Sequence, residues 1–251
     1  MSPSSRIRKI VILLFWVAIW QTAAQLIDNS IVFVGPYPVL CALFNLLPTP
    51  GFWLSVGSSL GKISLGFLAA FLCGLAIGCL AYHFTLLREF LEPIIRLMKS
   101  VPVASFVILA LIGIGSENLA VFISFLVVFP ILYVNTIAGL ENTDQKLLEM
   151  AQVFSVTPAG RLRCIYLPAL LPYLTSGCRI ALGMSWKSGI AAEVIGIPSH
   201  TIGENLYMAK IYLSTAELLA WTIVIILISA LFEKVFLLLL EKGVRLCFRF
   251  S

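Results

Sequence analysis

Long apolar runs alternate with short polar segments along this chain. Six runs are candidates for membrane-spanning helices: residues 10–27, 54–82, 101–113, 119–139, 173–196 and 216–240. Most are long enough, since about 20 apolar helical residues cross the hydrocarbon core of a bilayer. The run 101–113 is short, yet we count it as a span, because without it the basic residues that follow would lie outside and the positive-inside pattern would be lost. The pattern therefore predicts an all-α membrane protein with six transmembrane helices in a single domain covering residues 1–251.

A polar insert over residues 141–172 separates the fourth and fifth apolar runs. Asn142 with Gln145 three residues later predicts a helix start, in which a side-chain acceptor is backed by a reciprocal amide. Four apolar residues then share one face of a short amphipathic helix, at i, i+3, i+4 and i+7. They are Leu147, Met150, Ala151 and Phe154.

Thr157 and Pro158 predict the start of a second helix in the insert, because proline at the first helical position loses no needed hydrogen bond. Pro168 and Pro172 predict the end of that helix and the start of the next. The insert is therefore expected to be a helix-turn-helix. In a chain with little other soluble mass, a structured polar element is expected to do more than connect two spans.

The composition excludes a soluble globular protein. Hydrophobic residues make up 60% of the 251 residues and charged residues 12%, with a mean hydropathy of +1.03. About a quarter of a soluble domain is charged. The formal net charge of +5 is distributed as expected for cytosolic loops of a membrane protein, and no basic face with interleaved aromatic residues indicates a nucleic-acid partner. The lipid bilayer is the predicted environment.

The sequence shows no catalytic constellation. Its six cysteines have no CxxC spacing, and its two histidines, His83 and His200, lie near opposite predicted surfaces. Gly57 and Gly61 before Lys62 superficially resemble a phosphate-binding loop, but only three residues separate the glycines and no Ser or Thr follows the lysine. We therefore expect no enzyme activity, no metal site and no cofactor in this chain.

Charge also orients the chain. Three basic residues within 1–9 precede the first apolar run. A cleaved signal peptide would show the same order, but the run 10–27 is long enough to remain as a span. Both termini are expected in the cytosol. The segments 28–53 and 198–215 are expected outside, and 83–100, with three basic residues, is expected inside.

Ionisable residues at membrane depth are costly and usually functional, and the fifth run contains Arg179, Lys187 and Glu193. At about 100° per residue, Lys187 and Glu193 point about 120° apart and cannot form an i,i+4 pair. Their partners must come from other helices, a second subunit or a water-filled path. The two residues therefore either line a substrate path or belong to a buried structural pair. Arg179, at the cytosolic end, can also simply extend its guanidinium to the membrane surface.

The insert contains a spaced motif. It reads Glu149-Met150-Ala151, three residues, Ser155, nine residues, then Ile165-x-Leu167-Pro168. This is similar to the Glu-Ala-Ala loop of ABC importer permeases, which reads Glu-Ala-Ala, three residues, Gly, nine residues, Ile-x-Leu-Pro. Met150 and Ser155 depart from that pattern, and Ser155 leaves open whether the sharp glycine turn is kept. Further residues that resemble the nitrate/sulfonate/taurine branch lie within 55–240: Ser59-Leu60, Gly66-Phe67, Pro93, Pro102, Gly113-Ile-Gly115, Phe129-Pro130, Asn135-Thr136, Ala138-Gly139 and Ala192-Glu193-Val-Ile-Gly196.

The resemblance implies the architecture of type I ABC importer permeases, in which this loop docks onto an ATPase subunit and transmits its closure. The coupling residues are then Glu149, Ala151, Ser155, Arg161, Leu167 and Pro168, although Arg161 can also be a plain positive-inside marker. It implies two permease copies, expected as a homodimer, two ATPase subunits that bind ATP and Mg, and an extracytoplasmic solute-binding protein.

By the same resemblance, the chain is expected to be an inner-membrane permease subunit. It would move a small solute into the cytosol by alternating access, with Lys187, Glu193 and Arg179 as candidates for the substrate path. Nitrate, a sulfonate or a vitamin precursor are the expected solute types.

Two other classes stay open. An ion-gradient-driven secondary transporter could use Glu193 as its proton carrier, although the polar insert counts against it. A membrane anchor that holds an ATPase without transport would explain the insert but not the buried charges. Association with an ATPase separates an importer from a secondary transporter, and solute-stimulated ATP hydrolysis separates it from an anchor.

Overall fold

The computed structural model describes residues 3–27, 29 and 31–249, and every regular element within them is a helix. In chain order the helices are α1 (Pro3–Ile27), α2 (Pro36–Leu46), α3 (Pro50–His83), α4 (Thr85–Ser100), α5 (Val103–Ile114), α6 (Leu119–Glu141), α7 (Gln145–Val153), α8 (Pro158–Arg161), η1 (Leu162–Tyr166), α9 (Leu167–Gly196), α10 (Ile202–Ile211) and α11 (Thr215–Arg249). The outermost residues of both predicted cytosolic termini, 1–2 and 250–251, lie outside the described residues.

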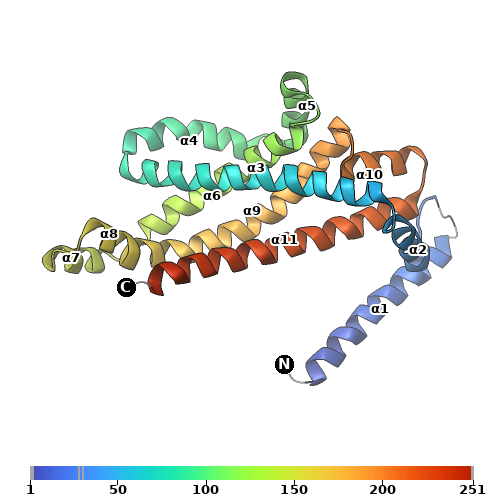
Figure 1. Ribbon diagram of the computed structural model, residues 1–251, viewed down its shortest axis with the longest axis horizontal. Coiled ribbons are helices and arrows are strands. Elements are labelled where there is room, and N and C mark those ends of the chain that lie inside the picture. The colour runs from blue at the N-terminus through green and yellow to red at the C-terminus, as the bar shows by residue number, and fades with distance from the viewer. Residues whose placement is uncertain (1–2, 28, 30, 250–251) are drawn as a thin grey trace.

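Four long helices, α3, α6, α9 and α11, form an elongated bundle (Figure 1). α6 lies between α3 and α9 and packs along both. The central core of the bundle is filled by large fully buried side chains such as Phe67, Leu132 and Leu182. Gly74 and Gly78 let α3 approach α6 closely, because a Cβ at either position would lie within 3 Å of a side-chain carbon of α6.

The number of helices long and apolar enough to cross a membrane is five among the described residues, and six if α4 and α5 count as one bent span. α4 and α5 meet at 105°. The break follows from Val101 and Pro102, since a residue before proline is pushed out of the helical region and Val101 is extended. α5 has only 12 residues, about 18 Å of helix, which is shorter than the hydrocarbon core of about 30 Å.

The predicted inner segment 83–100 contains the helix α4, which was not predicted because the three basic residues were used only to orient the chain and the helical periodicity was not considered. α4 is amphipathic, and its apolar side chains Leu91, Ile95 and Met98 pack on the central core. The predicted span 101–113 corresponds to α5 with the two residues before it, and α4 precedes it as a separate helix.

Both predicted outer segments also contain helices. α2 lies within 28–53, and α10 lies within 198–215. α10 is docked firmly, because Ile202 is fully buried in an apolar cluster with Phe52 and Trp221. The indole of Trp53 is exposed and donates a hydrogen bond to the carbonyl of Leu47 at 3.0 Å.

The two ends of the bundle are different (Figure 1). α7, α8 and the end of α11 lie at one end, and α2 and α10 lie at the other. α1 diverges from the bundle and contacts α2 near its own C-terminal half, where the indole of Trp20 donates a hydrogen bond to the carbonyl of Val34 at 2.9 Å. The apolar side chains along 10–16 are exposed in the monomer.

Candidate functional site

The first helix of the insert, α7, begins two residues later than predicted. Asp144 is its N-cap, and the Asp144 carboxylate accepts a hydrogen bond from the backbone N–H of Lys146 at 2.9 Å. Asn142 instead ends α6, and its side-chain amide donates to the hydroxyl of Tyr173. The predicted Asn142–Gln145 helix start was wrong because a tertiary contact with α9 takes the Asn142 side chain.

The turn between α7 and α8 keeps the glycine-type geometry despite the serine. Ser155 has φ 52°, in the left-handed region that glycine normally occupies at a helix C-terminus. The N–H of Val156 donates to the carbonyl of Ala151 at 2.8 Å, and the N–H of Ser155 donates to that of Gln152 at 3.0 Å. These two bonds form the Schellman motif, so Ser155 replaces glycine without loss of the sharp turn.

The second helix of the insert starts as predicted but does not end at proline. The Thr157 hydroxyl accepts from the N–H of Gly160 at 3.2 Å, which confirms the N-cap before Pro158. The prediction that Pro168 stops the helix was wrong: α8 continues through the π-helical turn η1 into α9, and the Leu167 N–H donates to the Leu162 carbonyl. A π turn accommodates the N–H that proline lacks.

The predicted coupling residues take different positions in this element. Glu149 is exposed, whereas Ala151 is buried beneath the turn. The Nε–H of Arg161 donates to the carbonyl of Val156 at 3.0 Å, which ties α8 back to the turn. Leu167 is half-buried and Pro168 is exposed.

The tip of the insert presents apolar side chains to solvent. Val153 and Phe154 are 80% and 74% exposed. Together with their exposed neighbours they form what we call the insert surface: Leu147, Met150, Val153, Phe154 and Leu162. Apolar groups that gather on a polar element outside the bundle indicate a protein-binding surface.

The root of the insert is packed tightly against the bundle. Leu140 of α6 and Leu170 and Leu174 of α9 form a buried cluster. A Cβ on Gly139 would lie 2.8 Å from a Leu170 methyl, so α6 and α9 touch closely here. The two helices that carry the insert are therefore closely packed against each other where the insert begins and ends.

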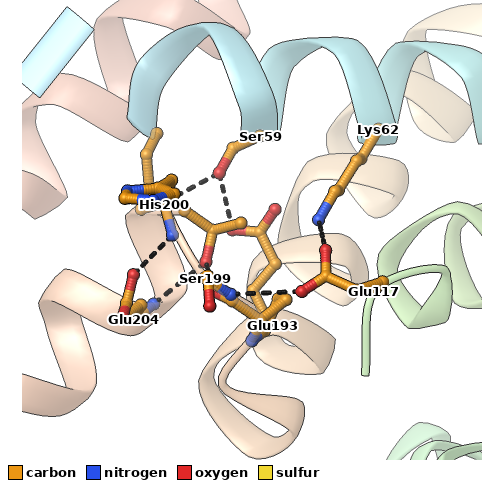
Figure 2. A network of polar contacts seen from close by, with 10 residues as sticks. Ser59, Lys62, Glu117, Glu193, Ser199, His200 and Glu204 are labelled. Carbon is orange, nitrogen blue, oxygen red and sulfur yellow. Dashed lines mark hydrogen bonds and ion pairs between the residues drawn. The ribbon is translucent and has the colours of Figure 1, made fainter. Parts of the chain in front are cut away.

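At the opposite end of the bundle, Glu193 of α9 is fully buried and joins three helices (Figure 2). Its Oε2 accepts from the Ser59 hydroxyl of α3 at 2.7 Å and from the N–H of Gly203 at 3.1 Å. The Ser59 oxygen in turn accepts from the N–H of Ile202 at 2.9 Å, and Thr201 caps the N–H of Glu204 at 3.2 Å. Glu193 and Ser59 thus supply acceptors that the N-terminal N–H groups of α10 need.

A second polar contact lies beside this network (Figure 2). The ammonium of Lys62 pairs with Glu117 at 2.7 Å, and Glu117 also accepts from the N–H of Ser199 at 3.4 Å. The hydrogen bond from Lys62 lowers the pKa of the Glu117 carboxyl below its ordinary value. The contact fixes the α5–α6 turn to α3 and to the segment before α10. Within the described part of the chain, no group of three or more His, Cys, Asp and Glu side chains is placed to hold a metal ion.

The three predicted substrate-path residues are not brought together. Lys187 and Arg179 are exposed on α9, and Glu193 is buried and bound to α3 and α10. No ion pair joins Lys187 to Glu193 among the described residues. The position of Glu193 favours a structural role with partners other than Lys187.

Several polar residues of these contacts were not singled out from the sequence. Lys62 lies within an apolar run and could have been found by the argument that identified Lys187. Ser59 was noted only among the residues that resemble the branch, and Glu117 gave no local signal because it lies in a turn. The charged residues of α4 were interpreted as markers of the inner side only.

Comparison with known proteins identifies the family. Residues 62–245 match the family described as binding-protein-dependent transport system inner membrane component. The taurine transport system permease protein TauC of Escherichia coli is 31% identical over 222 residues, which cover 86% of this chain and 80% of TauC. The nitrate import permease protein NrtB of Leptolyngbya laminosa is 30% identical over 145 residues, which cover 57% of this chain and 52% of NrtB.

A solved structure agrees with this at the level of the fold. The methionine ABC transporter MetNI, solved in inward-facing conformations, matches with a TM-score of 0.55 and 17% identity, over 79% of this chain and 98% of that one. The insert between α6 and α9, the helical bundle and the family match over most of the chain lead to one conclusion. This chain belongs to the binding-protein-dependent inner-membrane permeases of ABC importers, within the nitrate/sulfonate/taurine branch.

Proposed function

We propose that this chain is the membrane-embedded subunit of an ATP-driven importer for small anions, and that it works by alternating access. The relatives named for taurine and nitrate support this solute class. Taurine carries a sulfonate group, so both solutes present oxygens that share a negative charge. The chain itself contributes the path and not the ATPase chemistry.

The observation that carries the proposal is the insert surface on a stiff support. Its exposed apolar side chains suit a cleft on a separate ATPase subunit, the partner that the resemblance to ABC importer permeases implies. Glu149 is exposed on α7 and is the proposed ionic contact. Ala151, Ser155 and Arg161 are proposed to hold the turn between α7 and α8 in shape.

Leu167 and Pro168 follow the π turn, where the insert joins the long helix α9. We propose that closure of the ATPase subunits moves the insert, and that α6 and α9 pass this motion to the bundle. A π turn is a common place for functional bending in a helix. Lys187 and Arg179, on the exposed side of α9, are the proposed path residues. Glu193 is proposed to maintain the outer end of the bundle.

The complete assembly is proposed to contain two copies of this chain, two ATPase subunits that bind ATP and Mg, and a solute-binding protein at the end that carries α2 and α10. Both termini are proposed to be cytosolic, since the end of α11 lies at the same end of the bundle as the insert (Figure 1). A reporter active only outside the cytosol should work when fused near Pro48 or His200 and be silent near Glu149. Activity near Glu149 would contradict this orientation.

A test of the insert surface uses Phe154→Asp and, as a control, Tyr212→Asp, a similarly exposed aromatic residue outside the insert. If Phe154 docks in the ATPase, losing its burial costs about 1.5–3 kcal/mol, or about 10- to 150-fold in affinity. The measurement is the affinity of the purified chain for its ATPase, together with ATP-dependent uptake of labelled taurine or nitrate into proteoliposomes. If Phe154→Asp bound the ATPase as tightly as the control Tyr212→Asp, the docking role of Phe154 would be refuted.

The same assay separates the other classes of protein. A secondary transporter would take up solute without ATPase, driven by a proton gradient. The full burial of Glu193, with Oε2 already accepting two hydrogen bonds, counts against a proton-carrying role. A simple anchor would bind the ATPase without any solute-dependent hydrolysis.

A further inference from the structure

A cavity of about 310 Å³ lies between α4 and α6, towards the end of the bundle that carries the insert. Its polar lining comes from Arg88, Glu92, Arg96 and Lys99 of α4 and from Tyr133 and Glu141 of α6. The volume is at the lower end of the range of about 300–1,000 Å³ that is usual for small-molecule sites. None of these polar residues belongs to the insert surface or to the outer network.

Four of the five charged residues of α4 form a single stripe that faces this cavity, and the fifth, Glu89, does not line it. At about 100° per residue, Arg88, Glu92, Arg96 and Lys99 fall within about 80° of one another around the helix. The apolar residues Phe90, Ile94 and Leu97 lie on other faces and are exposed. A helix with this division places its charges towards water and its apolar side towards lipid or protein.

The stripe extends into the depth of the bilayer. α4 turns back from the inner end of α3 and runs alongside it (Figure 1), and its 16 residues are about 24 Å long. On α6, Tyr133 precedes Glu141 by eight residues, about 12 Å further from the inner end. Charges at this depth require water or ion partners, so the cavity is expected to be an aqueous recess that opens towards the cytosol.

Most of the charge in the cavity is already compensated. Arg88 pairs with Glu141, and Arg96 pairs with Glu92. Lys99 makes no ion pair with any described residue, so its ammonium leaves the lining with a net positive charge. The acidic residues are already neutralised by the arginines, which disfavours a cationic ligand.

Besides the net positive charge, the side chain of Tyr133 also indicates that this cavity binds a ligand. This side chain is 4% exposed, and its buried hydroxyl makes no hydrogen bond within the described structure. A buried polar group without a partner is uncommon and costly, and Tyr133 is one of the residues that line the cavity. A ligand with acceptor oxygens would satisfy it.

We propose that this cavity binds a small oxyanion, such as a sulfonate or nitrate, through the Lys99 ammonium and the Tyr133 hydroxyl. An oxyanion accepts hydrogen bonds from both donors and neutralises the excess positive charge. The inference rests on the proposed function, because it assigns this site to the imported solute on the inner part of its path. The site is separate from α9 and its three candidate path residues.

The test introduces Ala138→Cys, since Ala138 lines the same cavity, in the full-length chain held in lipid nanodiscs. Its reaction rate is measured with two thiol reagents of similar size, sulfonatoethyl and trimethylammonioethyl methanethiosulfonate. We expect the sulfonate reagent to react about tenfold faster, since a positive site concentrates anions. The chain without the new cysteine measures the background from the native thiols.

Two further variants identify the donors. Lys99→Met should reduce the preference for the sulfonate reagent to about twofold or less, and Lys99→Arg should restore it. Millimolar sodium nitrate or taurine should slow labelling of Ala138→Cys, whereas choline chloride at equal ionic strength should not. Tyr133→Phe should weaken this protection about tenfold without changing the melting temperature of the chain by more than a few degrees.

Equal rates with both reagents, or no protection by nitrate or taurine, would overturn the inference. The labelling assay needs no ATPase and no uptake, so its result does not depend on whether the chain is an importer. Protection together with a complete absence of ATP-driven uptake would support the anion site and refute the importer. Uptake of taurine or nitrate without protection would support the importer and refute this site.

Discussion

Glu193→Ala tests the role of the buried carboxylate at the outer end of the bundle. The change removes the acceptor of two hydrogen bonds, from Ser59 at 2.7 Å and from the N–H of Gly203 at 3.1 Å. Hydrogen bonds to a charged group contribute about 1.5–3 kcal/mol each, so the loss is about 3–6 kcal/mol. Relief of the desolvation of the carboxylate offsets part of it. We expect a net destabilisation of α10 docking of about 3 kcal/mol, or roughly a 150-fold increase in the open state.

Glu193→Gln separates the loss of the negative charge from the loss of the hydrogen-bond acceptor. The amide keeps an oxygen that can accept from Ser59 and Gly203. Its nitrogen replaces Oε1, which makes no hydrogen bond within the described structure. Removing the buried charge also removes its desolvation cost. The net change should therefore stay within about 1 kcal/mol, or about fivefold in the open population.

Trypsin cleavage after Lys210 reports the open state directly. Lys210 is exposed in α10 and is the one Lys or Arg between Lys187 and Lys234. Cleavage there requires local unfolding, and its rate follows the open population when reclosing is fast. Lys187→Met serves as the control, because Lys187 is exposed and pairs with no described residue.

The expected order of cleavage rates is wild type and Lys187→Met, then Glu193→Gln, then Glu193→Ala. An unchanged rate in Glu193→Ala would refute the docking role. A rate for Glu193→Gln as high as for the alanine variant would show that the negative charge itself is needed. If adding Lys187→Met to Glu193→Ala restored the wild-type cleavage rate, Lys187 and Glu193 would have to form a charge pair that the structure does not contain.

Three further changes test other parts of the chain. Ser155→Val should weaken ATPase binding about tenfold, because left-handed backbone costs a side chain about 1–2 kcal/mol and a β-branched one more, while Ser155→Gly should bind at least as well as wild type. The Glu117 carboxyl has a lowered pKa, so the stabilisation from Lys62 is present above the ordinary glutamate pKa of about 4.3 and is lost as the pH falls through the lowered value. The difference in melting temperature between wild type and Glu117→Gln should therefore shrink from pH 7 to pH 3, and a constant difference would contradict the assignment. Gly78→Leu should destabilise the bundle by about 1–3 kcal/mol through overpacking against α6, and Gly57→Ala, with open space around its Cβ, should not.

Much of this protein follows from local sequence signals. Apolar runs predict the long helices, because a helix in lipid must satisfy its own backbone and present apolar side chains. Thr157 before Pro158 predicts the start of α8, since capping depends on neighbouring residues alone. A GxxxG spacing such as that of Gly74 and Gly78 favours close helix packing, and α6 lies close to both positions.

Local signals fail where two neighbouring residues offer the same chemistry. Asn142 and Asp144 are both good N-caps, and only the contact of Asn142 with Tyr173 leaves the cap to Asp144. Pro168 is a strong helix stop in isolation. The π turn before it lets the helix continue, because packing of α9 against α6 stabilises the whole length.

The tertiary structure alone decides what the charged residues do. Glu193 and Ser59 are 134 positions apart in the sequence, so nothing in either neighbourhood predicts that both cap α10. The basic residues of α4 mark the cytosolic side in the sequence, but the fold turns α4 back along α3, and Lys99 and Tyr133 line the same cavity. A sequence pattern records the periodicity of one element, whereas the partners of a charge depend on which distant helices meet it in space.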